Sequence, residues 1–300
     1  MSLLSKLGNA SKAIVDSRYR FMYRQRRIED LAERQRRARD VAAARADHRL
    51  ADDPLAGKLE ADGIAPLPSL LSGEQIAEMR LYFTDRQATD PYRPTLGGFA
   101  APSSVPDGTH VAFFPHATVA AVPHGLALAN HPLVLSAVAD YLGCKPTIAY
   151  MTAWWSMVAD GTAQEAENFH RDYDDYKFVK LFVYLSDVDL QSGPHIFIRG
   201  SHVSEKLIER RRFDDDLVAA NFPDQDDHLT LIGPAGTMFL ETTFGLHRGF
   251  PPVAQNRLIF QVLYTLHPYY GGPAQPILTA GDISGIDGLD PYINRIYCRF

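Results

Sequence analysis

The residues with the clearest chemical potential are His170 and Asp172, in the stretch Asn168-Phe169-His170-Arg171-Asp172-Tyr173. In an extended strand, side chains two positions apart point to the same face, so an imidazole and a carboxylate converge while Arg171 points away. This pair supplies two ligands of a two-histidine, one-carboxylate facial site, which holds Fe(II) and leaves the opposite positions open. On spacing alone the triplet is a weak signal, because Asp174 lies on the same face and the third ligand must come from elsewhere. The sequence context must therefore decide.

The residues around the pair predict buried strands separated by turns. A run at 178–185 is apolar on both faces apart from Lys180 and Tyr184, which is typical of a strand buried on both sides. Further strands are predicted at 147–157, between two turns within 192–202, at 235–240 and at 257–264. Helices are predicted at 72–86 and 131–142. The pair thus lies among the elements of a β-rich domain.

At these residues the chain resembles the phytanoyl-CoA dioxygenase family, within the 2-oxoglutarate- and Fe(II)-dependent oxygenases. The resemblance covers roughly residues 58 to 270 and includes the turns Ser192-Gly193-Pro194 and Gly200-Ser201-His202. It implies a mainly β fold with flanking helices, built on a double-stranded β-helix core of the jelly-roll or cupin-like type.

The resemblance assigns roles to a set of four residues. Its catalytic iron ligands fall on His170, Asp172 and His247, and its clamp for the distal carboxylate of 2-oxoglutarate falls on Arg257, ten positions past the second histidine. A guanidinium on an inward face is costly to bury without an anion to meet it, which agrees with that role. The implied cofactors are Fe(II), 2-oxoglutarate as cosubstrate and O2.

The other contacts to the cosubstrate are open. No Ser follows two residues after Arg257 to share the carboxylate. Lys180 and Tyr184 lie on one strand face, so either reaches the 2-oxoglutarate carboxylate if that face points inward, although Lys180 can equally extend to solvent. Tyr150 and Thr152 share a face of the strand that lines the cosubstrate pocket in the family.

The entrance to the site carries polar residues of both signs. We expect Arg171, Tyr173, His195 and Arg248 near the substrate, which favours a small polar or carboxylate-bearing metabolite. Arg171 and Arg248 can equally be structural ion-pair partners of neighbouring aspartates. His110 fits no compact ligand spacing with the other histidines, so we interpret it as a solvent or rim histidine.

The composition is that of one large domain without secretory features. With 46% hydrophobic side chains, 300 residues can bury a single core. Cys144 and Cys298 offer at most one bridge and match no zinc spacing, so a reducing compartment is the simpler interpretation. No stretch has the apolar core of a signal peptide or the length to cross a bilayer. We expect a cytoplasmic protein that acts on a small molecule, without nucleic acid and without stable membrane insertion.

Residues 1–50 differ from the rest in charge and predict a basic, Arg/Ala-rich helical arm. They carry 13 basic and 6 acidic residues, whereas the remaining 250 residues carry 17 and 30. Arg18 to Arg49 contains no Gly or Pro, so we expect one long helix, docked on the acidic body or on a second subunit in a homo-oligomer. A basic arm on an anionic membrane surface or nucleic acid is the alternative. Residues 51–68 predict a linker, and 69–300 the jelly-roll oxygenase domain.

Two functions from different classes follow. Because Asp172 keeps the carboxylate that radical halogenases of this superfamily replace, the resemblance implies a hydroxylase, or an enzyme that otherwise oxidises a C–H bond, with release of succinate and CO2. The alternative is a noncatalytic jelly-roll binding or scaffold protein that uses its basic arm for assembly or surface attachment. Deleting residues 1–50 should leave turnover intact in the first case and abolish the main function in the second.

Overall fold

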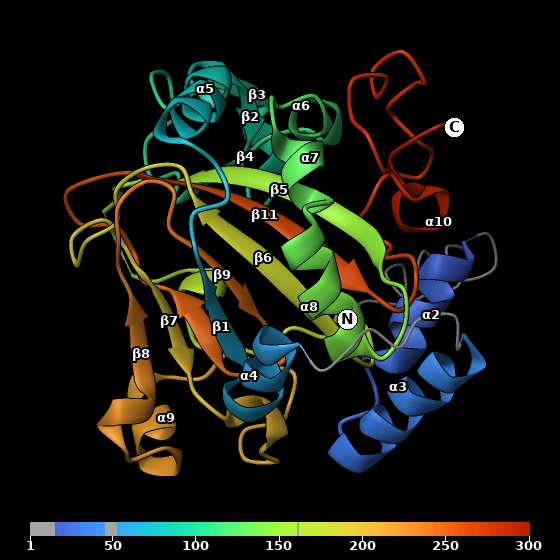
Figure 1. Cartoon of the computed structure of the whole chain (residues 1–300). Helices are drawn as coiled ribbons and strands as arrows, with labels where there is room; N and C mark the ends of the chain where they lie inside the picture. The colour runs from blue at the N-terminus through green and yellow to red at the C-terminus, as the bar shows by residue number, and fades with distance from the viewer. Residues whose placement is uncertain (1–15, 46–52, 161) are drawn as a thin grey trace.

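Two antiparallel sheets form the centre of the molecule (Figure 1). The computed structural model describes residues 16–45, 53–160 and 162–300. The larger sheet has the strand order β1 (Ile64–Leu67), β9 (Met238–Glu241), β6 (Phe178–Tyr184), β11 (Arg257–Thr265), β5 (Thr147–Ser156), β4 (Val111–Phe113), β2 (Arg86–Thr89), β3 (Gly98–Ala101). The smaller sheet has the order β10 (His247–Gly249), β7 (His195–Ile198), β8 (His228–Leu231). The predicted mainly β class with a jelly-roll core is confirmed.

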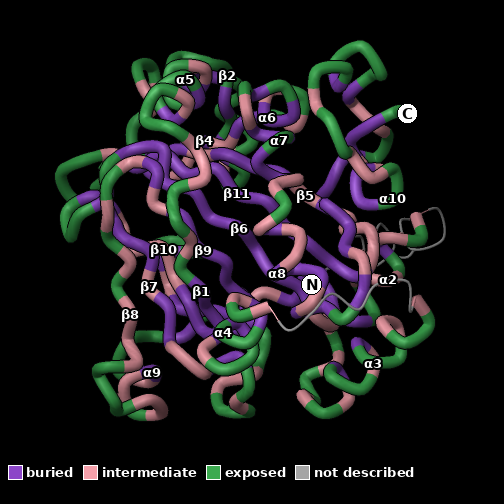
Figure 2. Tube along the Cα trace, viewed as in Figure 1, coloured by how far each residue is buried: buried purple, intermediate pink, exposed green. Residues whose placement is uncertain are grey.

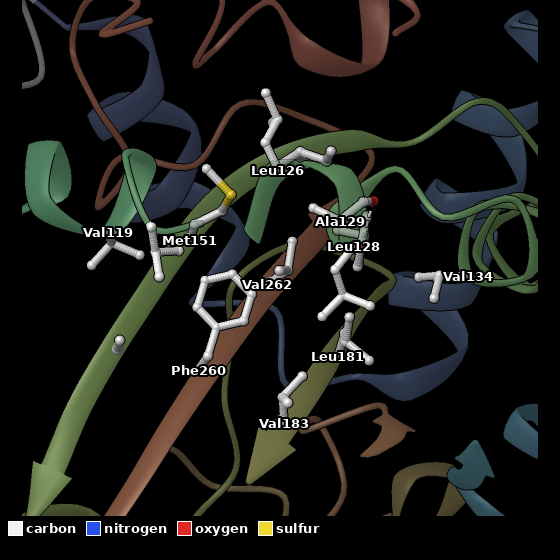
Figure 3. Close-up of a cluster of buried hydrophobic side chains, with 14 of the residues drawn as sticks. Val119, Leu126, Leu128, Ala129, Val134, Met151, Leu181, Val183, Phe260 and Val262 are labelled. Carbon is white, nitrogen blue, oxygen red and sulfur yellow. Dashed lines mark hydrogen bonds between the residues drawn. The ribbon is translucent and has the colours of Figure 1, made fainter. Parts of the chain in front are cut away.

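The larger sheet is covered on one face by helices, with apolar side chains between the two layers. Every second residue of β6 and β11 points to these helices, which the period of two in a strand requires. Figure 3 shows this layer, in which α7 (Gly125–Ala129) and the start of α8 (Pro132–Leu142) face the sheet; its labelled members include Leu126, Leu128, Leu181, Val183, Phe260 and Val262. The alternate side chains of the same strands face the smaller sheet. Because the helices do not cover that face, a site can form there.

The remaining helices are short and lie around the sheets (Figure 1). The predicted helix after Ser72 is confirmed as α5 (Gly73–Phe83), where Ser72 and Gln75 form a reciprocal capping box. The others are α4 (Pro54–Asp62), α6 (His116–Ala120), α9 (Asp215–Asn221) and α10 (Pro291–Asn294), with 3-10 turns η1 (Pro94–Leu96), η2 (Glu165–Glu167), η3 (Ser201–Val203) and η4 (Gln225–Asp227). Buried residues concentrate in the strands (Figure 2), and no described helix is both long and apolar enough to span a bilayer.

The segment predicted as a linker is instead part of the folded body. Within 53–68 the chain forms α4 and then β1, which pairs with β9 at one edge of the larger sheet. The Pro and Gly residues that suggested a linker mark the ends of the helix: Pro54 occupies its first turn, and Gly63 ends it with a φ of 83°. The prediction was wrong because Pro and Gly are common both in linkers and at the ends of helices.

The predicted single N-terminal helix is two helices. α2 (Ser17–Gln25) and α3 (Leu31–Ala44) are separated by a short turn, and Asp30 caps α3 by accepting a hydrogen bond from the Glu33 amide. Both pack on the body of the same chain: the Phe21 ring lies 4.2 Å from that of His267, and Arg18 donates to the Pro273 carbonyl at 2.8 Å. Residues 1–15 and 46–50 of the predicted arm lie outside the described residues.

Arg34 connects this arm to the segment that follows His170 and Asp172. Its guanidinium is only 1% exposed and donates to the backbone carbonyls of Gln25, Ile28 and Asp175. Burial lowers the pKa of Arg34 to about 10, so it stays charged at neutral pH. A buried cation with this many backbone partners holds two distant parts of the chain in one arrangement.

We expect Arg34→Ala to lower the free energy of unfolding by about 2–4 kcal/mol, because the carbonyls it serves would lose their buried donor. Urea denaturation followed by circular dichroism measures this change. Arg36→Ala removes an exposed partner of Glu33 from the same helix and should change stability by less than about 1 kcal/mol. Equal effects of the two substitutions would contradict the role given to Arg34.

Candidate metal centre and cosubstrate cavity

His170, Asp172 and His247 come together at the edge of the smaller sheet. His170 Nε2 lies 3.7 Å from Asp172 Oδ1, and His247 Nε2 lies 3.5 Å from Asp172 Oδ2. One ligand atom from each residue lies within 4.8 Å of the others, a group that fits one metal ion. Arg171 points away from it, as the alternation of an extended chain predicts. His170 and Asp172 thus converge as the strand spacing predicts, and His247, which the resemblance assigns as the third ligand, lies beside them.

The backbone orients both imidazoles toward the metal position. His170 Nδ1 lies 2.9 Å from the Asn168 carbonyl oxygen, and His247 Nδ1 lies 3.0 Å from that of Gly245. A carbonyl can only accept, so each Nδ1 carries the proton and each Nε2 presents a lone pair to the site. Burial and the neighbouring His247 hold the pKa of His170 well below its usual value, which favours the neutral form that a metal requires.

Lys180 balances the negative charge of the site. Its Nζ lies 2.6 Å from Asp172 Oδ2 and 2.9 Å from Asp174 Oδ2. Burial alone would raise the pKa of Asp172, but Lys180 and His247 hold it well below its usual value. Lys180 therefore orients the carboxylate ligand, and the expectation that it reaches the distal 2-oxoglutarate carboxylate is not supported by its contacts.

A cavity of about 200 Å³ opens beside the three ligands. Its wall is the inner face of the larger sheet, where alternate residues of β5 and β11 point inward. The predicted pair Tyr150 and Thr152 lines it, as does His195. From β11 the cavity receives Arg257, Ile259 and Gln261, and from β5 also Trp154 and Ser156. The cavity therefore joins the metal position to Arg257.

Arg257 is a buried cation with incomplete hydrogen bonding. It is 3% exposed, and its Nη2 donates to Ser156 Oγ at 3.1 Å, while Nε and Nη1 have no partner among the described residues. Gly249 makes room for it, since a Cβ there would lie 3.0 Å from Nη2. Buried donors of this kind are rare unless an anion meets them. A carboxylate in the cavity would satisfy them, so the residues fit a 2-oxoacid cosubstrate.

His195 and Glu241 form a buried pair behind the metal position. His195 Nε2 lies 2.9 Å from a Glu241 carboxylate oxygen, and the His195 and His247 rings stack at 5.5 Å. Burial lowers the pKa of His195 to about 3 and raises that of Glu241 to about 8. Both groups are then neutral at pH 7, so the pair adds no net charge to a site that already holds several charged groups.

Four predicted residues do not reach the cavity. Tyr184 donates its hydroxyl to the Leu231 carbonyl at 2.8 Å and is fully buried between the sheets. The hydroxyl that accepts from Arg257 belongs to Ser156. Arg248 pairs with Asp215 at 2.7 Å on the outer side, in agreement with its structural alternative.

Arg171 and Tyr173 are also structural. All N–H groups of the Arg171 guanidinium are used by backbone carbonyls, which belong to Ser201, Ser204, Lys206, Leu207 and Phe244. The Tyr173 hydroxyl donates to the Ile208 carbonyl. Neither residue lines the cosubstrate cavity, because a side chain that points away from the ligand face meets the loop behind it.

Sequence reasoning missed several residues of the cavity wall. Ser156 lies two positions beyond Trp154 on the face already assigned to Tyr150 and Thr152, so extending the alternation by one step would have found it. His110 is 4% exposed and pairs with Glu167 at 2.9 Å, which corrects its interpretation as a solvent or rim histidine. Its loop position gave no periodic signal.

The family model described as phytanoyl-CoA dioxygenase (PhyH) matches residues 59–241, more than half of the chain and including His170 and Asp172. The chain belongs to the phytanoyl-CoA dioxygenase family. It is accordingly a dioxygenase of the non-haem iron, 2-oxoglutarate-dependent kind, and the three-residue group agrees with this class. The match ends before His247 and Arg257, which the fold brings to the same cavity as His170 and Asp172.

Solved structures share the fold at low sequence identity. EctD from S. alaskensis in its apoform has a TM-score of 0.52 and 16% identity, over 73% of this chain and 80% of that chain. HygX from Streptomyces hygroscopicus with nickel and 2-oxoglutarate bound has a TM-score of 0.51 and 14% identity, over 83% of this chain and 100% of that chain. No curated protein matches the sequence. The likeness at this identity concerns the fold alone.

Glu241→Gln should remove a pH dependence of stability. An unfolded glutamate ionises near its ordinary pKa, whereas burial keeps folded Glu241 protonated to about pH 8, so the folded state holds an extra proton between these values and loses stability as pH rises through them. We expect the stability of metal-free Glu241→Gln relative to wild type to increase by more than about 1 kcal/mol from pH 5 to pH 8 in urea denaturation. The exposed Glu205→Gln should show no such trend; a parallel trend would disprove the assignment.

Proposed function

We propose that this dioxygenase binds Fe(II) through His170, Asp172 and His247, and binds 2-oxoglutarate through Arg257 and Ser156 to oxidise a C–H bond of a small polar metabolite. The observation that carries the proposal is the buried Arg257 guanidinium with unpartnered donors in the same cavity as the three ligands. A cation and a metal position at two ends of one small cavity suit a dianion that chelates a metal at one end.

The residues of the chain orient the reactants and exclude water. When bound, iron with 2-oxoglutarate and O2 supplies the oxidising power, and the cosubstrate leaves as succinate and CO2. His170 and His247 present neutral Nε2 atoms, and Lys180 holds the second oxygen of Asp172. Phe182 and Ile259 contribute apolar wall, which keeps the ion pairs of the site strong. The C–H bond to be oxidised must lie beside the metal position.

The dimensions of the cavity bear on the substrate. At about 200 Å³ it is smaller than an ordinary small-molecule pocket of roughly 300–1,000 Å³. It therefore suits the cosubstrate together with the reacting end of a substrate whose remainder lies outside. The structure of S. alaskensis EctD with 2-oxoglutarate and 5-hydroxyectoine, which has a TM-score of 0.51, supports a small polar substrate class for this fold.

The noncatalytic alternative is not supported by the position of the arm. Residues 16–45 pack on the body of their own chain and reach the segment beside the metal ligands, where Arg26 donates to the Tyr173 carbonyl at 3.1 Å. Deleting residues 1–50 would therefore damage either function, and the deletion does not separate the two hypotheses. A homo-oligomer formed through the arm and a cytoplasmic location stay predictions.

Anaerobic addition of Fe(II) and 2-oxoglutarate should produce a weak visible charge-transfer band that requires both components. Asp172→Ala should lose iron binding, and Arg257→Ala should keep iron but need at least about tenfold more 2-oxoglutarate to develop the band, because a charge-assisted contact is lost. Arg80→Ala, on the exposed surface of α5, serves as the control. Iron binding without any band in wild type would refute the cosubstrate assignment.

Ser156→Ala should affect the binding of 2-oxoglutarate without affecting the binding of Fe(II). The serine lies against Arg257 and away from the metal ligands, so we expect the Kd for 2-oxoglutarate to rise about threefold to tenfold while the Kd for Fe(II) stays unchanged. Titration of the same band measures the first value and equilibrium dialysis the second. Ser284→Ala, exposed near the C-terminal end, should alter neither. An unchanged 2-oxoglutarate affinity would remove Ser156 from the site.

A further inference from the structure

A second cavity of about 300 Å³ lies beside the metal position and is lined almost entirely by arginines. We call it the arginine cavity; its lining is Arg26, Arg171 and Arg210–Arg212, with Asp172 and Tyr173. Asp172 also lines the cosubstrate cavity, so the two cavities lie on either side of one residue, the carboxylate ligand. Arg257 does not line the arginine cavity, which separates it from the proposed 2-oxoglutarate site.

The five arginines differ in how many of their donors are already used. Arg171 donates all its N–H groups to backbone carbonyls and has none left for a ligand. Arg211 lies over the Phe213 ring at 4.4 Å, and Arg212 meets Glu165 in an exposed pair at 3.3 Å. Arg26 is held through its Nε and Nη2, which leaves Nη1 unused. Arg210 makes no hydrogen bond or ion pair with any described residue.

The arginines of this cavity are only partly paired with acidic residues: Arg212 meets Glu165 and Arg26 meets Asp174, while Arg210 and Arg211 form no ion pair with a described residue. The only acidic residue that lines the arginine cavity is Asp172, whose carboxylate is already paired with Lys180 at 2.6 Å. Partial burial and the like charges of Arg26 and Arg212 lower the pKa of Arg210. Arginines are brought together in this way, against their mutual repulsion, at sites where an anion binds.

We propose that the arginine cavity binds an oxyanion of the substrate, a carboxylate or a phosphate, and so directs the substrate's reacting end to the metal position beside Asp172. The inference rests on the proposed function, because it concerns the substrate of that same site. Arg210 is the main ligand, since its planar fork is unoccupied and matches the two oxygens of either group. Arg26 and Arg212 line the same cavity and add positive charge. The N-terminal arm therefore contributes a substrate residue.

The location explains how an anchored substrate meets the oxidant. Asp172 and Arg210–Arg212 line the same cavity, so the loop at 210–212 borders the carboxylate ligand. The backbone that carries it is fixed by Arg171, whose carbonyl partners at 201–207 lie in the preceding segment. A substrate held at Arg210 would thus extend along Asp172 into the smaller cavity.

The test measures anion binding directly, without turnover. Protein loaded with Fe(II) and 2-oxoglutarate under nitrogen is titrated calorimetrically with methyl phosphate and, separately, with propionate at constant ionic strength. We expect one of the two to bind with one-to-one stoichiometry, and the tighter probe identifies the oxyanion class. Arg210→Ala should weaken it about fivefold to tenfold and Arg210→Lys less, because lysine keeps the charge but not the fork.

The controls make each result decisive. Arg80→Ala removes the same charge from exposed α5 and should change the Kd by less than about twofold at this ionic strength. If neither probe binds wild type, or if Arg210→Ala binds as well as wild type, the inference is overturned. An equal loss in Arg80→Ala would also overturn it, since the effect would be one of net charge. Arg210→Ala should still form the charge-transfer band, because Arg210 lies outside the proposed 2-oxoglutarate site. Absence of the band in wild-type protein would instead refute the proposed function, and this result is distinct from a failure of anion binding.

Discussion

The site depends on a reciprocal pair of backbone hydrogen bonds between His170 and His247. The His170 amide donates to the His247 carbonyl at 3.0 Å, and the His247 amide donates back at 3.1 Å. In an antiparallel pair this pattern sets two residues directly opposite each other with side chains on one face. The ring centroids consequently lie 4.2 Å apart, and Asp172 joins them because it is two residues further along an extended chain. Sheet geometry thus brings the three side chains of the proposed metal position together.

The N-terminal arm is held mainly by arginine contacts to backbone carbonyls. Arg18, Arg26, Arg34 and Arg45 each donate to a carbonyl of the body, whereas the ion pair of Arg26 with Asp174, at 3.8 Å, is the only one that joins the described part of the arm to the body. The opposite net charges of the arm and the body attract the two parts without fixing their orientation. The hydrogen bonds to backbone carbonyls fix that orientation. The arm closes over the segment after the iron motif and so belongs to the catalytic body.

The number of N–H groups that already have acceptors distinguishes the structural arginines from those proposed to bind a ligand. Arg171 and Arg34 are buried and donate to several backbone carbonyls, which makes them part of the framework, although Arg34 Nε has no partner among the described residues. Arg257 is equally buried but leaves Nε and Nη1 without partners, and Arg210 has none at all among the described residues. A buried cation without an acceptor, such as Arg257, is a cost to the fold that binding of an anion offsets, whereas the donors of the exposed Arg210 are available to a ligand from solvent. The residue type alone does not distinguish these arginines from one another in the sequence.

The sequence by itself determined the local geometry of the site and the class of the fold. Period two placed His170 with Asp172, Tyr150 with Thr152 and Arg257 with Gln261, and the same rule extended by one step would have reached Ser156. The tertiary structure decided which partner each side chain meets. Lys180 binds Asp172 and Tyr184 binds a backbone carbonyl, although both lie on the face that the alternation assigned. It also decided that Arg171 anchors a loop while Arg210, in an exposed segment without periodicity, borders the metal ligands. The reason is physical: strand alternation is set by neighbouring residues, whereas the end of a long side chain finds its partner among groups brought close only when the sheets and loops pack.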